Sequence, residues 1–161
     1  MAKHVLNTSY ENYDFVLIGL SCTENQYVLA SSISDILNIS FYLSDYIPFH
    51  LKEGKLFNFS LYRYIDEELG LEYFFIPNIS NFEEVNPNRV FENDLFSEMP
   101  VDETVRLIKE LPKTDYFLIL KGESAHVQQY KIIEALKQLN EIIQLQVIQA
   151  NDLASKRNLI F

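Results

Sequence analysis

Two carboxylates, Glu110 and Asp115, stand close together in the stretch RLIKELPKTDYFLIL, which runs from residue 106 to residue 120. A catalytic acid and base could use such a pair if a cleft held them and their pKa values differed. A tight turn over residues 111–114, with Pro112 at its second position, would instead leave both side chains exposed beside the turn. Asp115 would then accept hydrogen bonds from backbone donors at the turn, and Glu110 would lie on a solvated strand face. We favour this structural interpretation and predict no catalytic residue.

Cys22 is the only cysteine, and it stands between an expected strand and an expected helix. A helix N-terminus can lower the pKa of a thiol, which would favour a nucleophile. No sequence spacing forces His4, His50 or His126 to lie beside it, so a small buried cysteine is the better interpretation. The histidines also show no metal-ligand spacing, and we predict neither a metal nor another cofactor.

The expected strand-to-helix turns at residues 19–23 and 122–124 offer free helix N–H groups, which can bind an anion. Neither turn contains a phosphate-binding loop with several glycines, so ordinary capping accounts for both. An anion at one of these turns is the basis of the alternative function considered below.

Hydrophobic patterning predicts the elements that position these residues. Residues 13–21 and 115–120 are apolar on both faces, as buried strands are. Residues 56–65 alternate, with Phe57 and Phe59 on one face and Tyr62 and Tyr64 on the other. Further strands are expected at 39–44, at 71–77, before the turn at 111–114, and at 141–149, where Ile143, Leu145 and Val147 share a face.

Two helices complete the expected order. The first follows a capping-box spacing between Ser21 and Glu24, and the second follows Gly122 and the candidate N-cap Ser124. The order is β-α-β-β-β, a long acidic irregular connection at 78–103, and then β-β-α-β. This predicts an α+β fold: a single domain over residues 1–161, built as a two-layer sandwich with a mixed, mostly antiparallel sheet and two main helices. We expect one covered sheet face, and we expect the apolar C-terminal tail to dock.

Composition excludes several classes of function. The chain has 161 residues and a net charge of −10, and its basic residues form no patch, so we expect no nucleic-acid partner. No segment approaches the roughly 20 apolar residues that span a bilayer, so we expect no membrane partner. A single cysteine permits no intramolecular disulfide, and we expect a cytoplasmic location.

Four residues of the opening stretch also match a known pattern. Ile108, Glu110, Asp115 and Tyr116 fit I-P-E-x-x-x-V-D-Y, with Lys109 and Thr114 in place of the proline and the valine. The stretches DFVLIGLS, NQYVLA, DLFSE and SKRNLIF agree in order and spacing. The chain thus resembles the IPExxxVDY family of bacterial proteins, which has no assigned activity. The resemblance implies a bacterial cytosolic origin and a structural role for the four motif residues.

These observations favour a non-enzymatic interaction or assembly protein, dimeric, which binds itself or another protein through exposed aromatics, a sheet edge or the docked tail. The candidate contact residues are Tyr62, Tyr64, Phe91 and Phe96, although cross-strand packing explains the two tyrosines equally well. The alternative is a small-molecule-binding regulatory module that holds an anion. An enzyme that uses Cys22 or the two carboxylates is the third choice.

Overall fold

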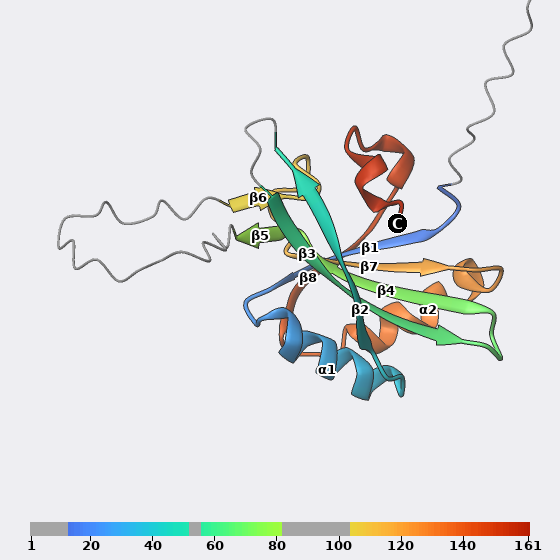
Figure 1. The fold of residues 1–161 in the computed structure, drawn as a ribbon. Coiled ribbons are helices and arrows are strands. Elements are labelled where there is room, and N and C mark those ends of the chain that lie inside the picture. The colour runs from blue at the N-terminus through green and yellow to red at the C-terminus, as the bar shows by residue number, and fades with distance from the viewer. Residues whose placement is uncertain (1–12, 52–55, 82–103) are drawn as a thin grey trace, which may run out of the picture.

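A computed structural model describes residues 13–51, 56–81 and 104–161 (Figure 1). Phe91 and Phe96 lie outside these ranges, as does most of the acidic connection. Within them the chain forms, in order, β1 (Val16–Cys22), α1 (Gln26–Leu37), β2 (Tyr42–His50), β3 (Leu56–Asp66), β4 (Leu71–Pro77), β5 (Ile79–Asn81), β6 (Thr104–Arg106), β7 (Tyr116–Lys121), α2 (Ala125–Leu136), β8 (Ile142–Ile148) and the 3₁₀ turns η1 (Ala150–Asp152) and η2 (Lys156–Leu159).

The main sheet has six strands in the order β2-β3-β4-β7-β1-β8, and β5 pairs with β6 in a second, small sheet. Every neighbouring pair in both sheets is antiparallel. Since β7 and β8 both run antiparallel to β1, they are parallel to each other, and α2 connects them across β1. The predicted α+β sandwich with a mostly antiparallel sheet and two main helices is confirmed.

Alternate residues of the central strands build a core on each face of the sheet. Val16, Ile18 and Leu20 of β1 face the helices and pack among the buried side chains of α1 and α2. Leu17 faces the other way, into a core that the residues around Ile108 and the C-terminal segment complete. In Figure 1 both helices lie below the sheet and the C-terminal segment, in red, lies above it.

The expectation of one covered face was therefore wrong. The predicted docking of the tail is confirmed, because the side chain of Leu159 is fully buried. The ring of Phe161 contacts Phe74 with 5.6 Å between the ring centroids. Each fully buried side chain of this size stabilises the fold by about 1.5–3 kcal/mol, which explains how a tail without a long helix can cover a sheet face.

The helix α1 begins later than its sequence pattern suggests. Asn25 is the N-cap, and its side-chain oxygen accepts a hydrogen bond from the backbone N–H of Val28. The predicted capping box of Ser21 and Glu24 was wrong, because β1 continues through Ser21 to Cys22. The helix ends at Leu37, and its C-cap Asn38 adopts the left-handed conformation that asparagine tolerates well.

Two other predicted strands differ in detail from the structure. The strand expected at 39–44 begins at Tyr42 and continues to His50. In β8, Leu145 packs on the helix-side core, but Ile143 is 71% exposed and its neighbour Ile142 packs there instead. A register shift opposite Ser21 and Cys22 causes this exchange, because one extra residue reverses the side to which later side chains point.

The segment before β7 is not the predicted edge strand. Only residues 104–106 form a strand, which pairs with β5, and turns follow over residues 107–113. The predicted turn at 111–114 is confirmed, since the N–H of Thr114 donates to the carbonyl of Leu111 at 3.2 Å. The buried strand predicted after it is β7.

Gly122 closes the end of β7 at a place that only glycine can occupy. Its φ is +130°, and a Cβ there would lie 2.1 Å from the carbonyl oxygen of Gly70. Gly70 also has a positive φ, of +58°, but a Cβ there would meet no atom within 4 Å.

We predict that Gly122→Ala lowers the free energy of unfolding by about 3 kcal/mol or more, because it adds a backbone clash to the conformational strain. Gly70→Ala is the matched control and should cost only about 1–2 kcal/mol, the penalty of a left-handed alanine. Urea unfolding of the two variants measures both values, and equal losses would contradict the packing described for Gly122.

Candidate functional site

The structure separates the two carboxylates that the sequence suggests as a pair. Glu110 lies in the turns before β7, where its carboxylate accepts hydrogen bonds from the backbone N–H of Ser155 at 2.6 Å and from the Ser155 hydroxyl at 2.8 Å. Asp115 accepts from the backbone N–H of Cys22 at 2.9 Å. Glu110 thus holds the C-terminal segment, and Asp115 holds the end of β1.

The other two motif residues extend the same framework. Ile108 is fully buried in the core beneath the C-terminal segment. Tyr116 donates its hydroxyl proton to the carbonyl oxygen of Glu24 at 2.7 Å, which joins the start of β7 to the turn before α1. Burial, together with the nearby charges of Cys22, Asp115 and Glu24, raises the pKa of Tyr116 to about 12.

Asn78, which follows β4, connects the motif to the sheet, and our sequence reasoning missed it. Its side chain is fully buried, and its Nδ2 donates to the carbonyls of Ile108, Leu111 and Thr114 at 3.3, 3.0 and 2.9 Å. Its Oδ1 accepts from the N–H of Ile108 at 2.8 Å. The backbone of Asn78 adds bonds to Asp115 and Leu107. One amide therefore supplies the polar partners that the irregular segment cannot find within itself.

Cys22 is a buried thiol without the surroundings of a nucleophile. Burial raises its pKa, the N–H of Glu24 opposes this by donating to Sγ at 3.3 Å, and the carboxylates of Glu24, Asp115 and Glu141 raise the pKa further. A raised pKa disfavours the thiolate, which is the reactive form. Of the described histidines, His126 contacts Asp14 instead, with 3.1 Å between Nε2 and Oδ1.

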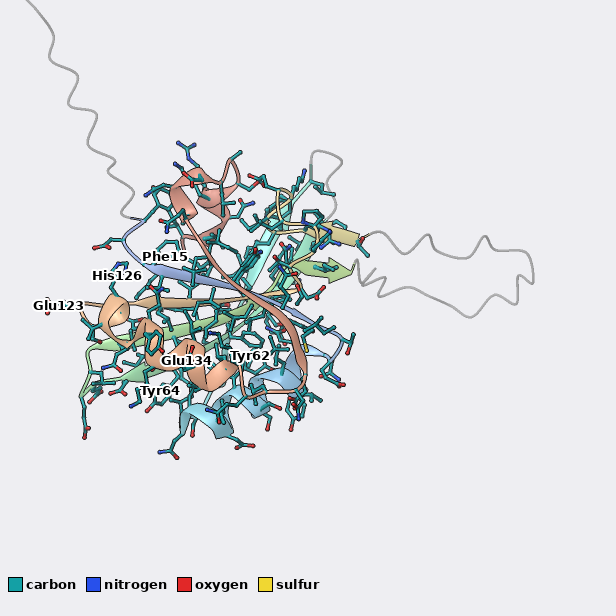
Figure 2. All side chains as sticks on the ribbon, turned by 180° about the vertical axis from the view of Figure 1, so that it is seen from behind. Phe15, Tyr62, Tyr64, Glu123, His126 and Glu134 are labelled. Carbon is teal, nitrogen blue, oxygen red and sulfur yellow. The ribbon has the colours of Figure 1, made fainter. Side chains whose placement is uncertain are left out.

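The predicted contact residues Tyr62 and Tyr64 lie half-buried on the side of the sheet that carries the helices (Figure 2). Tyr62 is paired with Phe75 and Tyr64 with Tyr73, at ring-centroid distances of 6.5 and 5.8 Å. This is cross-strand aromatic packing. A role for these two residues in protein contacts remains a prediction.

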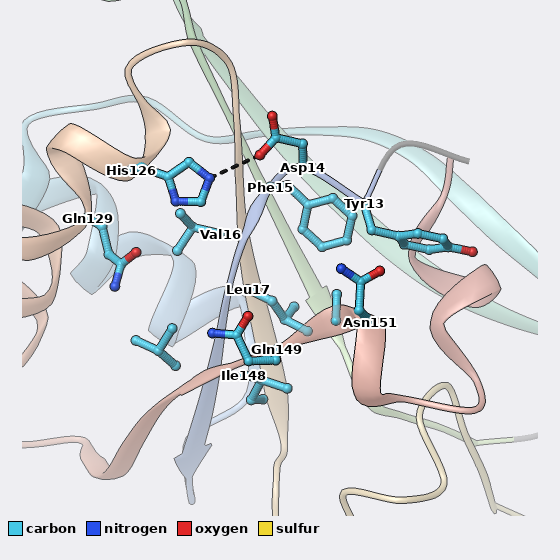
Figure 3. A pocket seen from close by; sticks show the side chains of 12 residues that line it. Tyr13, Asp14, Phe15, Val16, Leu17, His126, Gln129, Ile148, Gln149 and Asn151 are labelled. Atoms are coloured by element: carbon cyan, nitrogen blue, oxygen red, sulfur yellow. Dashed lines mark hydrogen bonds and ion pairs between the residues drawn. The ribbon is translucent and has the colours of Figure 1, made fainter. Parts of the chain in front are cut away.

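A polar cavity of about 440 Å³ opens where β1 begins, α2 begins and β8 ends (Figure 3). It forms because the β1–β8 ladder ends at Leu17 and Ile148, after which the chain turns away into η1. His126 and Asp14 flank the cavity, and their side chains are 63% and 72% exposed. An ion pair this exposed contributes about 1 kcal/mol at most, so it provides no buried acid or base.

The strand β8 is one of the two edges of the sheet, and it carries exposed apolar side chains. Ile143 is 71% and Val147 is 41% exposed. On α2, which connects to β8, Val127 and Tyr130 are exposed as well. Tyr130 follows His126 by four residues and so lies on the same face of α2.

Among residues 13–51, 56–81 and 104–161, no three histidine, cysteine or acidic side chains gather as they would to hold a metal ion. None of the helices in these ranges has the length and apolar character needed to cross a membrane. Comparison of the chain with protein-family models, with curated proteins and with solved structures finds no match.

We predict that Asn78→Ala lowers the free energy of unfolding by about 3 kcal/mol or more, because it leaves several buried backbone groups without a partner. Chemical denaturation tests this, with the exposed Asn140→Ala as a control that should change stability by less than about 0.5 kcal/mol. A small loss for Asn78→Ala would contradict the role given to the amide.

Asn78→Asp adds a pH signature to the same test. A buried carboxylate facing three carbonyls has a raised pKa in the folded state, so this variant is most stable below the unfolded pKa of about 4 and loses stability as the pH rises. Asn78→Ala should show no such additional loss.

For Glu110, burial acts to raise the pKa, but the hydrogen bonds from Ser155 outweigh it and lower the pKa overall. A lowered folded-state pKa means that the stabilisation is present above the unfolded pKa and is lost as the pH falls through the folded pKa. We predict that the amide of Ser155 loses hydrogen-exchange protection between about pH 5 and pH 3. Glu110→Gln should show a several-fold lower protection factor at pH 7 and lack this pH dependence.

The matched control is Glu134→Gln, since Glu134 bonds Lys137 on α2 and has no contact with the C-terminal segment. Equal protection of Ser155 in the wild type and in Glu110→Gln would show that Glu110 does not hold the tail.

Proposed function

We propose that the chain is a non-enzymatic assembly protein that pairs with a second copy of itself through the free edge of β8. The observation that carries this proposal is an exposed, uncharged and self-complementary edge strand. An unpaired edge offers a row of backbone N–H and C=O groups to another strand, and natural proteins usually protect such edges.

The two edges of this sheet differ in that protection. The strand β2 contains Asp45 and Pro48, and its register with β3 is irregular between Leu43 and Asp45. Proline and charge hinder pairing with a further strand, whereas a register shift occurs at both edges, in β8 opposite Ser21 and Cys22. The strand β8, IIQLQVI, contains no proline and no charged residue. Of the two edges, β8 is therefore the better suited to accept a partner strand.

The order of residues in β8 favours a second copy as that partner. Read in either direction from Leu145, the strand presents a glutamine, then Ile143 or Val147, then an isoleucine. An antiparallel pairing with Leu145 on a two-fold axis therefore places Ile143 opposite Val147 twice, as an isologous interface requires. The backbone edge beside both exposed apolar side chains becomes paired, the two copies of Leu145 face each other, and each glutamine of β8 faces a glutamine.

Electrostatics does not oppose this pairing, although the chain has a net charge of −10. In the same register Glu141 falls opposite Gln149 of the second copy, so no like charges face each other across the strands. Strand pairing of this length buries less than the roughly 1,600 Å² of a standard interface, so we expect a dissociation constant in the micromolar range.

We also propose, from the motif residues alone, that the chain is related to the IPExxxVDY proteins and is bacterial and cytoplasmic. In this interpretation the motif is structural: Ile108, Glu110, Asp115 and Tyr116 stabilise the sheet that pairs through its β8 edge. Their hydrogen bonds and burial described above support that role.

We predict that sedimentation between about 1 and 100 µM shows a monomer–dimer equilibrium for the wild type. Val147→Lys should raise the dissociation constant at least about tenfold, because it brings a charged side chain into the paired strand of each copy, and a lysine on an edge strand hinders pairing. Leu69→Lys is the matched control, since Leu69 has the same 41% exposure as Val147 but lies in the β3–β4 turn.

A wild type that stays monomeric over this range would overturn the proposal. So would a Val147→Lys variant that dimerises as the wild type does. Circular dichroism of both variants verifies that they fold.

A further inference from the structure

A second opening in the fold lies between α1 and the strands β2, β3, β4, β5 and β7, and does not involve β8. It is a crevice of about 570 Å³. Its lining includes Gln26, Tyr46, Asn58, Ser60, Ser80 and Tyr116. None of the residues that line it comes from β8, so binding in this crevice does not depend on the proposed dimer.

The crevice forms where Pro77 interrupts the hydrogen bonding between β3 and β4. The β3–β4 register runs to Tyr62 and Phe75, and its next hydrogen-bonded pair would join Ser60 to Pro77. Proline has no N–H to give to the carbonyl of Ser60. Beyond this point β3 remains paired with β2, and β4 remains paired with β7, so the two strands separate.

Side chains form hydrogen bonds with backbone carbonyls near the place where the two strands separate. Gln26 Nε2 donates to the carbonyls of Ser60 and Phe75 at 3.0 and 3.5 Å, and the hydroxyl of Ser60 donates to Gln26 Oε1. Ser80 Oγ donates to the carbonyl of Asn58 at 2.8 Å. These bonds hold the crevice open in a defined shape, which lowers the entropic cost of binding a ligand there.

The lining combines amide and hydroxyl groups with apolar surface from Pro77 and Ile79, and it carries no charge. In a chain with a net charge of −10, none of the described residues that border the crevice is acidic or basic. A charged ligand would lose its hydration without meeting an opposite charge, and a wholly apolar ligand would cover the exposed amide of Asn58 and the hydroxyl of Tyr46 without offering them a partner. The chemistry of the lining therefore favours a neutral ligand rich in hydroxyl groups.

We propose that this crevice binds a neutral saccharide. Tyr46 lies on β2 opposite Ser60 and is 54% exposed, so its ring offers an apolar face on which a sugar ring can pack, and its hydroxyl is a polar tip. Asn58 lies nearby on β3 and is exposed, so its amide can exchange hydrogen bonds with sugar hydroxyls. The volume lies within the range of small-molecule sites.

The test is titration calorimetry, with saturation-transfer NMR, of the full chain against glucose, galactose, mannose, N-acetylglucosamine, maltose, lactose and cellobiose. At least one neutral sugar should bind with a dissociation constant of about 1 mM or lower, and Tyr46→Ala should weaken it at least about tenfold. Glucuronate, glucose 6-phosphate and inorganic phosphate should bind at least about tenfold more weakly than that sugar.

Tyr42→Ala is the matched control, because Tyr42 lies on the same strand with 49% exposure but does not border the crevice. It should bind the sugar as the wild type does. The proposal is overturned if no sugar saturates the protein at about 10 mM, if the two tyrosine variants weaken binding equally, or if phosphate binds better than every sugar.

Discussion

The buried amide of Asn78 connects the end of β4 to the irregular segment before β7, and the arrangement of the motif depends on this connection. A segment of turns buried under a sheet has backbone groups that no ladder satisfies, and each would cost free energy if left alone. Because Asn78 bonds Ile108, Leu111 and Thr114 together, the segment has one shape. That shape directs Glu110 to the C-terminal segment and so completes the second core.

The proposed functions arise where strand pairing stops. At Pro77 the ladder between β3 and β4 ends, and the crevice lined by neutral side chains follows from that single missing N–H. At β8 the sheet itself ends, with apolar side chains and no charge or proline to prevent further pairing. The motif carboxylates, by contrast, accept hydrogen bonds from the fold itself, Glu110 from Ser155 and Asp115 from Cys22.

The sequence allowed prediction of those features that local patterns determine. The alternation in β3 correctly assigned Phe57 and Phe59 to one core and Tyr62 and Tyr64 to the other face, because the side-chain period of a strand is two. The turn at 111–114, the glycine after β7 and the docking of the tail also followed from local chemistry. From the sequence, a sheet edge was only one of several possible contact surfaces, beside exposed aromatics and the docked tail.

What could not be predicted depends on contacts between distant residues. Asn78 appeared only as one of many asparagines, since its partners lie 30 to 36 positions later in the chain. The exposure of Ile143 depends on a register shift against Cys22. The crevice depends on which strands are the neighbours of β3 and β4 in the sheet. No local pattern carries that information.

The central claim is that two copies pair through β8 with Leu145 on the two-fold axis. The most direct measurement is an isotope-filtered NOE experiment on a mixture of methyl-labelled and unlabelled protein at a concentration where the dimer forms. Side chains directly opposite on antiparallel strands have Cβ atoms about 5 Å apart, so the account predicts intermolecular NOEs between the methyl groups of the two copies of Leu145. Intermolecular NOEs that arise from β2 or from the helices, with none from β8, would contradict it.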